Sequence, residues 1–440
     1  MSEVVDKWVE RLHDMPKIGQ MTHRERLEKA FSLEEPDMVP ACPELDQWQL
    51  LYAGYDYRQT WDDVDKLTDG VLKTFADFRP DCIFPHICPS YVLDPYLTPE
   101  QRAKAYDLRD GRSYVVFHEI THDIDEAIKQ YESKPWKKYG LGRTGSSYLP
   151  HFNQLLEVRD RIGNTVPIVL GLGNVSNNAE FFVGTQYLME WTINQKDKLH
   201  YLFEMLTEQL LEVYDSCKPY AAAGVKFLCM FGGARTWGPR QIEEFGRYDK
   251  MIADAASEIF PFAWFHICGN NLPLAMAKLA THGFKAIQYD EPMQQLSRGG
   301  WTWGKWCEWV ARLYHGKLCA MNAPTCQAAL HRTPQEIETM VKDFIEHTTP
   351  WTTAVMMPGC ELSVLTPVEN VRAMIDATRK WGKYPECKTR AAALWTEEEF
   401  EASLQKLGIA SKIPDWAYSW KRFNGKMPQR KPVAGKVMPA

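Results

Sequence analysis

The sequence predicts an α/β protein built as a (β/α)₈ barrel, on two observations. Short apolar runs recur along the chain, at residues 38–43, 82–87, 166–171, 225–231, 260–267, 286–289, 318–321 and 353–357. Amphipathic stretches with helical spacing separate most of these runs, at 197–214, 239–259, 272–280, 334–347 and 367–381. Eight strands that alternate with helices are the number that a closed parallel barrel needs. A doubly wound sheet with added elements is the alternative.

Helix-start signals support this reading. Thr22 stands three residues before Glu25, which is a capping-box pattern. Thr333 and Thr366 each precede a proline at the expected first helical position and an acidic residue at the third. We expect one domain at 21–390, a helical extension at 1–20, and a C-terminal helix with a mobile tail at 391–440, because the last residues are rich in Pro, Lys and Gly.

Composition excludes several classes of protein. The net charge of −6 gives no basic surplus for a nucleic-acid backbone. The sequence contains no run of 18 consecutive apolar residues, so it predicts no membrane span. The start of the chain lacks the apolar core of a signal peptide. The cysteine count of 11 is odd, which favours reduced thiols over a disulfide framework. We expect a cytoplasmic protein with no membrane or nucleic-acid partner.

Three motifs suggest chemistry but lack the context that it needs. His118, Glu119 and His122 fit the H-E-x-x-H pattern of zinc peptidases, which requires a helix, whereas β-branched residues here favour a strand or loop. The G-x-G-x-x-G pattern at 140–145 does not follow a buried strand, so it indicates a loop. His86 and Cys88 follow a strand, but a structural role is favoured over metal binding.

The strongest motif is His266-Ile-Cys268, which follows a run with the composition of a buried strand. Alternation along a strand places His266 and Cys268 on one side. Cys360, after the last predicted strand, offers a third ligand at the same barrel mouth. Three such ligands suit Zn²⁺ and leave one coordination position open, which Asp290 or Glu291 could fill when substrate is absent. The alternative is a packed histidine and two buried thiols.

With these residues in view, the sequence resembles the uroporphyrinogen-decarboxylase-like superfamily, and within it the zinc-dependent corrinoid methyltransferases. The resemblance rests on the entry at 22–40, on the motif at 266–270, on the Asn322-Ala-Pro turn, and on the segment from 358 to 371. It implies a TIM barrel in which His266, Cys268 and Cys360 bind zinc and an acid near Glu291 serves as a displaceable ligand.

Two departures refine what the resemblance implies. The stretch 43–52 has no cation to hold a polycarboxylate tetrapyrrole, which argues against decarboxylation of one. The chain has no D-x-H-x-x-G signature, so we expect the corrinoid to arrive on a separate carrier protein.

Zinc serves methyl transfer in either of two directions. It can polarise the oxygen of a methyl ether, or it can activate a thiol. The 16 tryptophans of the chain favour a methoxylated aromatic substrate and hence O-demethylation. The aromatic residues near predicted strand ends are Trp48, Tyr52, Trp237, Trp264, Tyr289, Trp301, Trp303 and Trp351. Methylation of a thiol of the coenzyme M type or of a pterin is the alternative, and a zinc peptidase is less favoured. Whether the chain is a monomer or a homodimer stays open.

Overall fold

The computed structural model describes residues 2–56, 59–60, 63–85, 96, 120–134, 148–232, 237–267, 283–291 and 299–406. At its centre lies a six-stranded parallel sheet whose strands are neighbours in chain order. The strands are β1 (Val169–Gly173), β2 (Phe227–Gly232), β3 (Phe262–Ile267), β4 (Ala286–Gln288), β5 (Cys319–Asn322) and β6 (Ala354–Met356). All six fall within or at the edge of apolar runs that the sequence singled out.

Two short extended segments connect the outer strands of this sheet. Ala41 forms a parallel bridge with Met356 of β6, and Ile83 forms one with Ile168, next to β1. The backbone N–H of Asp81 donates to the carbonyl of Ala41 at 2.7 Å, which joins the two segments. Backbone hydrogen bonds thus run from β6 through both segments to β1, as in an eight-stranded barrel.

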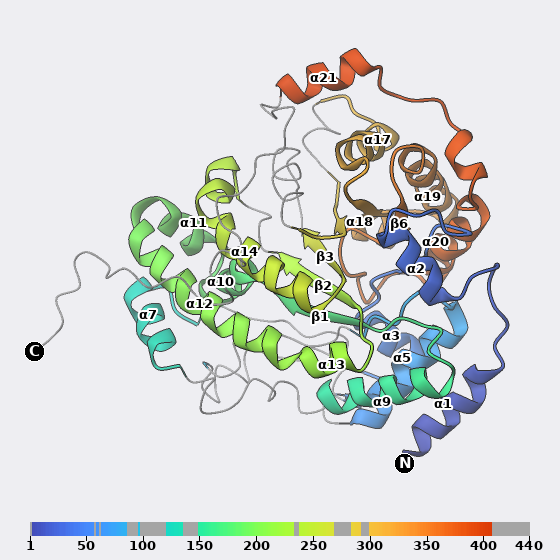
Figure 1. Cartoon of the computed structure of the whole chain (residues 1–440), viewed down its shortest axis with the longest axis horizontal. Helices are drawn as coiled ribbons and strands as arrows, with labels where there is room; N and C mark the ends of the chain where they lie inside the picture. The colour runs from blue at the N-terminus through green and yellow to red at the C-terminus, as the bar shows by residue number, and fades with distance from the viewer. Residues whose placement is uncertain are drawn as a thin grey trace, which may run out of the picture.

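Helices surround the sheet (Figure 1), with α10 to α14 on one side of β1–β3 and α17 to α20 near β6. Their bounds are α1 (Glu3–His13), α2 (His23–Phe31), α3 (Trp48–Ala53), α5 (Val64–Phe78), α7 (Ile124–Glu132), α9 (Tyr148–Arg161), α10 (Val175–Val183), α11 (Thr185–Asn194), α12 (Lys196–Ser216), α13 (Lys218–Ala222), α14 (Pro239–Ile259), α17 (Trp303–Tyr314), α18 (Cys326–His331), α19 (Pro334–Thr348), α20 (Val368–Trp381) and α21 (Glu397–Lys406), with a 3₁₀ turn η4 (Glu386–Thr389). The predicted helix at 272–280 and the C-terminal tail lie outside the described residues.

The helix starts predicted at Thr22 and Thr333 are present, and both form capping boxes. Thr22 caps α2 and Thr333 caps α19. In each case the threonine hydroxyl accepts a hydrogen bond from the backbone N–H of the glutamate three residues on, and the carboxylate of that glutamate accepts one from the backbone N–H of the threonine. The third start signal is displaced by one residue. Pro367 is the cap of α20 and lies before the first helical residue, Val368.

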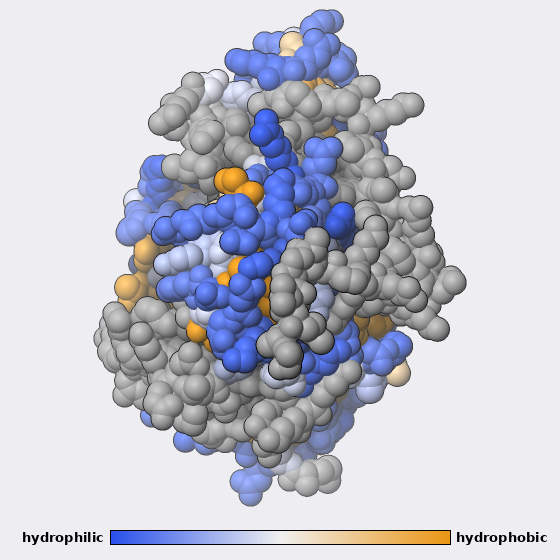
Figure 2. Space-filling model, turned by 90° about the vertical axis from the view of Figure 1, so that its left-hand side faces the viewer, coloured by the Kyte–Doolittle hydropathy of each residue, from blue (hydrophilic) through white to orange (hydrophobic). Residues whose placement is uncertain are grey.

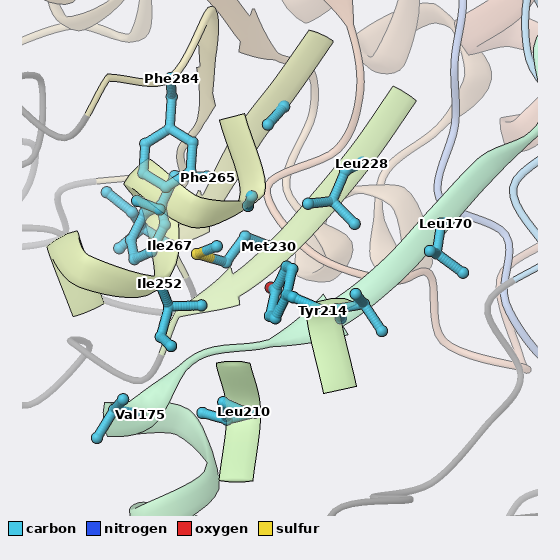
Figure 3. Packing of buried hydrophobic residues seen from close by; sticks show 14 of the residues in the cluster. Leu170, Val175, Leu210, Tyr214, Leu228, Met230, Ile252, Phe265, Ile267 and Phe284 are labelled. Atoms are coloured by element: carbon cyan, nitrogen blue, oxygen red, sulfur yellow. The ribbon is translucent and has the colours of Figure 1, made fainter. Parts of the chain in front are cut away.

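The strands present alternate residues to two different cores, as the period of a pleated strand requires. Leu228 and Met230 of β2 lie near Tyr214 of α12 and Ile252 of α14, and Phe265 of β3 packs against Phe284 (Figure 3). Residues of the other parity, among them Cys229, Trp264, Ala286, Cys319 and Val355, form a separate buried cluster. This second cluster fills the interior of the barrel, and His266 has the same parity as Trp264.

The described surface carries few large apolar side chains. Among described residues, the exposed large hydrophobic side chains are those of Ile193, Leu365 and Val368. The face that carries α11 and α12 is mostly hydrophilic where it is described, with small separated apolar patches (Figure 2). No helix in the described part of the chain is long and apolar enough to cross a membrane.

Candidate active site

His266 occupies the carboxyl end of β3 inside the barrel. It is 2% exposed, and its ring meets Phe231 edge-on at a centroid distance of 5.5 Å. Phe231 lies parallel to Phe84 at 6.3 Å, and Phe84 meets Trp264 edge-on at 5.9 Å. We call Phe84, Phe231 and Trp264 the aromatic cluster. It gives His266 apolar surroundings on one side.

A buried carboxylate that the sequence analysis missed lies beside His266. Glu44 is 2% exposed, and its Oε2 atom is 3.8 Å from Nδ1 of His266. The side-chain amide of Gln288, on β4, donates a hydrogen bond to the same Oε2 atom at 2.7 Å. Because Glu44 directly follows the first predicted strand, the rule that barrel enzymes place reactive residues after strands could have identified it.

The loop after β6, which carries Cys360, contacts this same group. Gln288 Nε2 also donates to the carbonyl of Pro358 at 2.6 Å, and the N–H of Leu362 donates to the carbonyl of Glu44 at 2.9 Å. These bonds fix the loop on both sides of Cys360. Gln288 therefore joins the residue beside His266 to the loop of Cys360.

Cys326 also belongs to this region. Its side chain is half-buried, and its Sγ atom donates to the carbonyl of Cys360 at 3.1 Å. Cys217, Cys229, Cys307 and Cys319 are buried, and no disulfide joins two of the nine described cysteines.

Asp290 and Glu291 lie two and three residues after the end of β4. Asp290 packs against Gly359, because a Cβ atom added at Gly359 would lie 2.7 Å from its Cγ. Trp306 donates its indole N–H to the carbonyl of Asp290 at 3.1 Å. Burial, and then the charge of Asp290, raise the pKa of Glu291, although Arg332 opposes the shift. Both acids thus lie at the same end of the barrel as Cys360.

Two more carboxyl groups make this end of the barrel acidic. Asp46 is 2% exposed, and burial raises its pKa well above the usual range, as do the neighbouring charges of Glu361 and Glu44. Glu361 is the residue after Cys360.

The remaining predicted ligands fall partly outside the described residues. Cys268 lies there, as do His86, Cys88, His118, Glu119 and the loop at 140–145. Among described residues, no group of three or more His, Cys, Asp or Glu side chains is placed to hold a metal ion. His122 precedes α7 and is not in a helix, and its ring stacks on Tyr187 at 4.0 Å. The described part of the motif, residues 120–122, is not helical, whereas a zinc peptidase needs this motif on a helix.

Most of the aromatic residues expected at strand ends pack among helices. Trp48 stacks on Tyr52 at 5.3 Å, Trp237 stacks on Phe203 at 6.1 Å, and Tyr289 meets Trp306 edge-on at 5.8 Å. Of the residues predicted to form an aromatic wall, Trp264 lies in the interior cluster below His266. Phe84 and Phe231 supply the other rings.

Comparison with known proteins defines the class. The sequence matches the uroporphyrinogen decarboxylase (URO-D) family over residues 22–381. This is more than half of the chain, which therefore belongs to that family. Among curated proteins, the chain is similar to the methylcobamide:CoM methyltransferase MtaA of Methanosarcina barkeri, with 20% identity over 222 residues. The match spans 50% of this chain and 60% of that protein.

A solved structure supports the fold. A methyltransferase from Methanosarcina mazei superposes with a TM-score of 0.60 at 18% identity, covering 82% of this chain and 99% of that one. At this identity the likeness concerns the fold.

Proposed function

We propose that this chain is a methyltransferase that moves a methyl group between a small substrate and the cobalt of a separate corrinoid carrier protein. Similarity to a methylcobamide-dependent enzyme supports the reaction class. The structural observation that carries the proposal is the convergence of buried His266, Glu44 and the loop of Cys360 through Gln288.

We further propose that His266, Cys268 and Cys360 bind one zinc ion. The imidazole of His266 is 2% exposed. The thiol of Cys360 lies on the loop whose Pro358 carbonyl accepts a hydrogen bond from Gln288. An imidazole and a thiolate are donors that suit zinc. When bound, zinc supplies Lewis-acid activation of the substrate atom in its open position. Asp290 or Glu291 is proposed to fill that position in the absence of substrate.

The protein side chains have separate tasks in this scheme. The aromatic cluster packs against the ring of the substrate, and the burial of His266 excludes water from its surroundings. The raised pKa of Glu291 favours its protonated form. A protonated carboxyl group there is suited to donate its proton to a departing oxygen.

For the substrate we propose a methoxylated aromatic compound, which would release a phenol. The aromatic cluster near His266 supports it, because aromatic rings pack favourably against a methoxylated ring. The similarity to a CoM methyltransferase favours methylation of a thiol as the second candidate. No disulfide joins two of the described cysteines, and this supports a cytoplasmic location as part of the proposal.

The test combines the full-length protein with a reduced corrinoid protein and a panel of methoxyarenes, and separately with a methylated corrinoid protein and small thiols. We expect methoxyarenes to be consumed, with formation of methyl-cobalt and free phenol. Consumption of methyl-cobalt by a thiol, with every methoxyarene unreacted, would establish the second candidate. Absence of both reactions with an active carrier would refute the methyltransferase assignment.

A further inference from the structure

Two buried polar side chains, Glu44 and Gln288, lie on the Nδ1 side of His266. Nδ1 lies 3.8 Å from Oε2 of Glu44, and both side chains are at least 97% buried. Oε2 also accepts the 2.7 Å hydrogen bond from Gln288. The side-chain oxygen of Gln288 accepts a hydrogen bond from the indole N–H of Trp264 at 3.3 Å.

This order of donors and acceptors fixes the orientation of Gln288. Its oxygen faces the only donor of the Trp264 indole, so its NH₂ group faces Glu44 and the carbonyl of Pro358. The carboxylate of Glu44 is thereby held on the Nδ1 side of His266. A carboxylate accepts but does not donate, so it favours a proton on Nδ1.

We propose that Glu44 is a positioning residue that holds His266 in the tautomer with the proton on Nδ1, leaving Nε2 as the metal-binding nitrogen. A histidine that binds a metal commonly donates its other ring N–H to a carboxylate, which orients the ring and raises its basicity. The present 3.8 Å between Nδ1 and Oε2 is longer than a hydrogen bond, so the proposal requires the two groups to approach more closely when the metal binds. The inference rests on the proposed function for its metal, but the pairing of Glu44 with His266 stands on the geometry alone.

The arrangement also couples two of the proposed ligands. Gln288 Nε2 bonds both to Glu44, beside His266, and to Pro358, two residues before Cys360. A change at Glu44 therefore acts on the ring of His266 and on the loop of Cys360 together. A residue that only filled space at this position would have neither effect.

Three variants of the full-length protein test the proposal. Glu44→Leu removes the acceptor and the charge, and Glu44→Gln keeps an oxygen that can accept from Nδ1 but removes the charge. Asp46→Asn is the matched control, because Asp46 is equally buried in the same loop and the charges that raise its pKa are those of Glu361 and Glu44. Thermal unfolding of each variant checks that the fold is retained.

The first measurement is ¹⁵N NMR of metal-free protein with labelled histidine rings, in which the signals of His266 are identified by their loss in His266→Asn. We expect the Nδ1–H tautomer in the wild type, in Glu44→Gln and in Asp46→Asn, and a shift toward Nε2–H in Glu44→Leu. An unchanged tautomer in Glu44→Leu would overturn the proposal, whether or not the protein binds zinc.

The second measurement is the dissociation constant for zinc. We expect it to rise about 10- to 100-fold in Glu44→Leu, less in Glu44→Gln, and little in Asp46→Asn. X-ray absorption should show the same ligand atoms in the wild type and in Glu44→Gln. Loss of an oxygen ligand in Glu44→Gln would make Glu44 a metal ligand and overturn its positioning role. A wild type that binds no zinc would refute the proposed metal site and leave the tautomer result to decide the pairing.

Discussion

At the scale of single residues, the site depends on contacts between distant parts of the sequence. Gln288 and Glu44 are 244 positions apart, yet their side chains share a 2.7 Å hydrogen bond. Sequence spacing identified His266 and Cys360 because both follow strand-like runs. It did not identify Glu44, since the burial of a carboxylate is decided by partners on other strands.

The close approach of Gly359 to Asp290 gives a prediction for the loop of Cys360. An added Cβ atom would lie within 2.8 Å of three atoms of Asp290. We expect Gly359→Ala to move the loop, to weaken zinc binding and to lower the free energy of unfolding by about 1–3 kcal/mol, as overpacking does. Gly238→Ala is the control, because its Cβ atom would meet only the end of the flexible Gln241 side chain at 3.1 Å. Equal zinc affinity in both variants would contradict the expectation.

Asp249 on α14 gives a prediction about pH. Burial raises the pKa of this carboxyl from 3.8 to about 6, although Ser176 donates to it from its N–H and its hydroxyl. The folded protein therefore holds a proton that the unfolded chain releases between pH 4 and 6. Stability from this group is fully present below about pH 4 and is lost as pH rises to 6.

The measurement is the free energy of unfolding of the wild type and Asp249→Asn between pH 4 and 7. The wild type should lose about 2–3 kcal/mol relative to the variant over this range, from roughly two pKa units at 1.36 kcal/mol each. A difference between the two proteins that does not change with pH would show that Asp249 has an ordinary pKa.

At the scale of elements, local sequence signals located helices and strands closely. The run at 225–231 contains β2 apart from its last residue, and α14 has the bounds that the sequence indicated. In the described residues, the first two predicted strands form isolated bridges, at Met38, Ala41 and Ile83, instead of continuous ladders. The apolar pattern of a sequence indicates which residues are buried. How many residues pair along a strand depends also on the neighbouring strand, which the pattern does not describe.

The aromatic residues show a second limit of local signals. Proximity to a strand end suggested that Trp48 and Tyr289 face the substrate, but both belong to clusters packed against helices. A sequence gives the position of a residue after a strand, whereas the turn that follows decides which way the side chain points.

The capping box of α19 can be tested by itself. Thr333 accepts a hydrogen bond from the N–H of Glu336, and the carboxylate of Glu336 accepts one from the N–H of Thr333. Thr333→Ala should lower the free energy of unfolding by about 1 kcal/mol, which denaturant titration can resolve. Thr339→Ala, an exposed site within the same helix, should have little effect. Similar losses in both variants would mean that the cap contributes no specific stability.

At the scale of the whole molecule, the eightfold alternation of apolar runs and helices was enough to predict the barrel. The structure continues the six parallel strands with two bridged segments, and the URO-D family match spans the same region. The barrel brings the ends of β3 and β6 to one mouth, which is why a histidine and a cysteine far apart in sequence can share a site. The substrate does not follow from the fold, because one barrel supports many reactions.

The central claim is that one zinc ion is bound by His266, Cys268 and Cys360, and elemental analysis of purified protein tests it most directly. We expect about one zinc per chain in the wild type. Cys268→Ala and Cys360→Ala should lose the metal and keep the fold, as three protein ligands are the minimum for a catalytic site. Stoichiometric zinc in both variants would contradict the assignment, and equal loss in His118→Ala would point to the H-E-x-x-H motif instead.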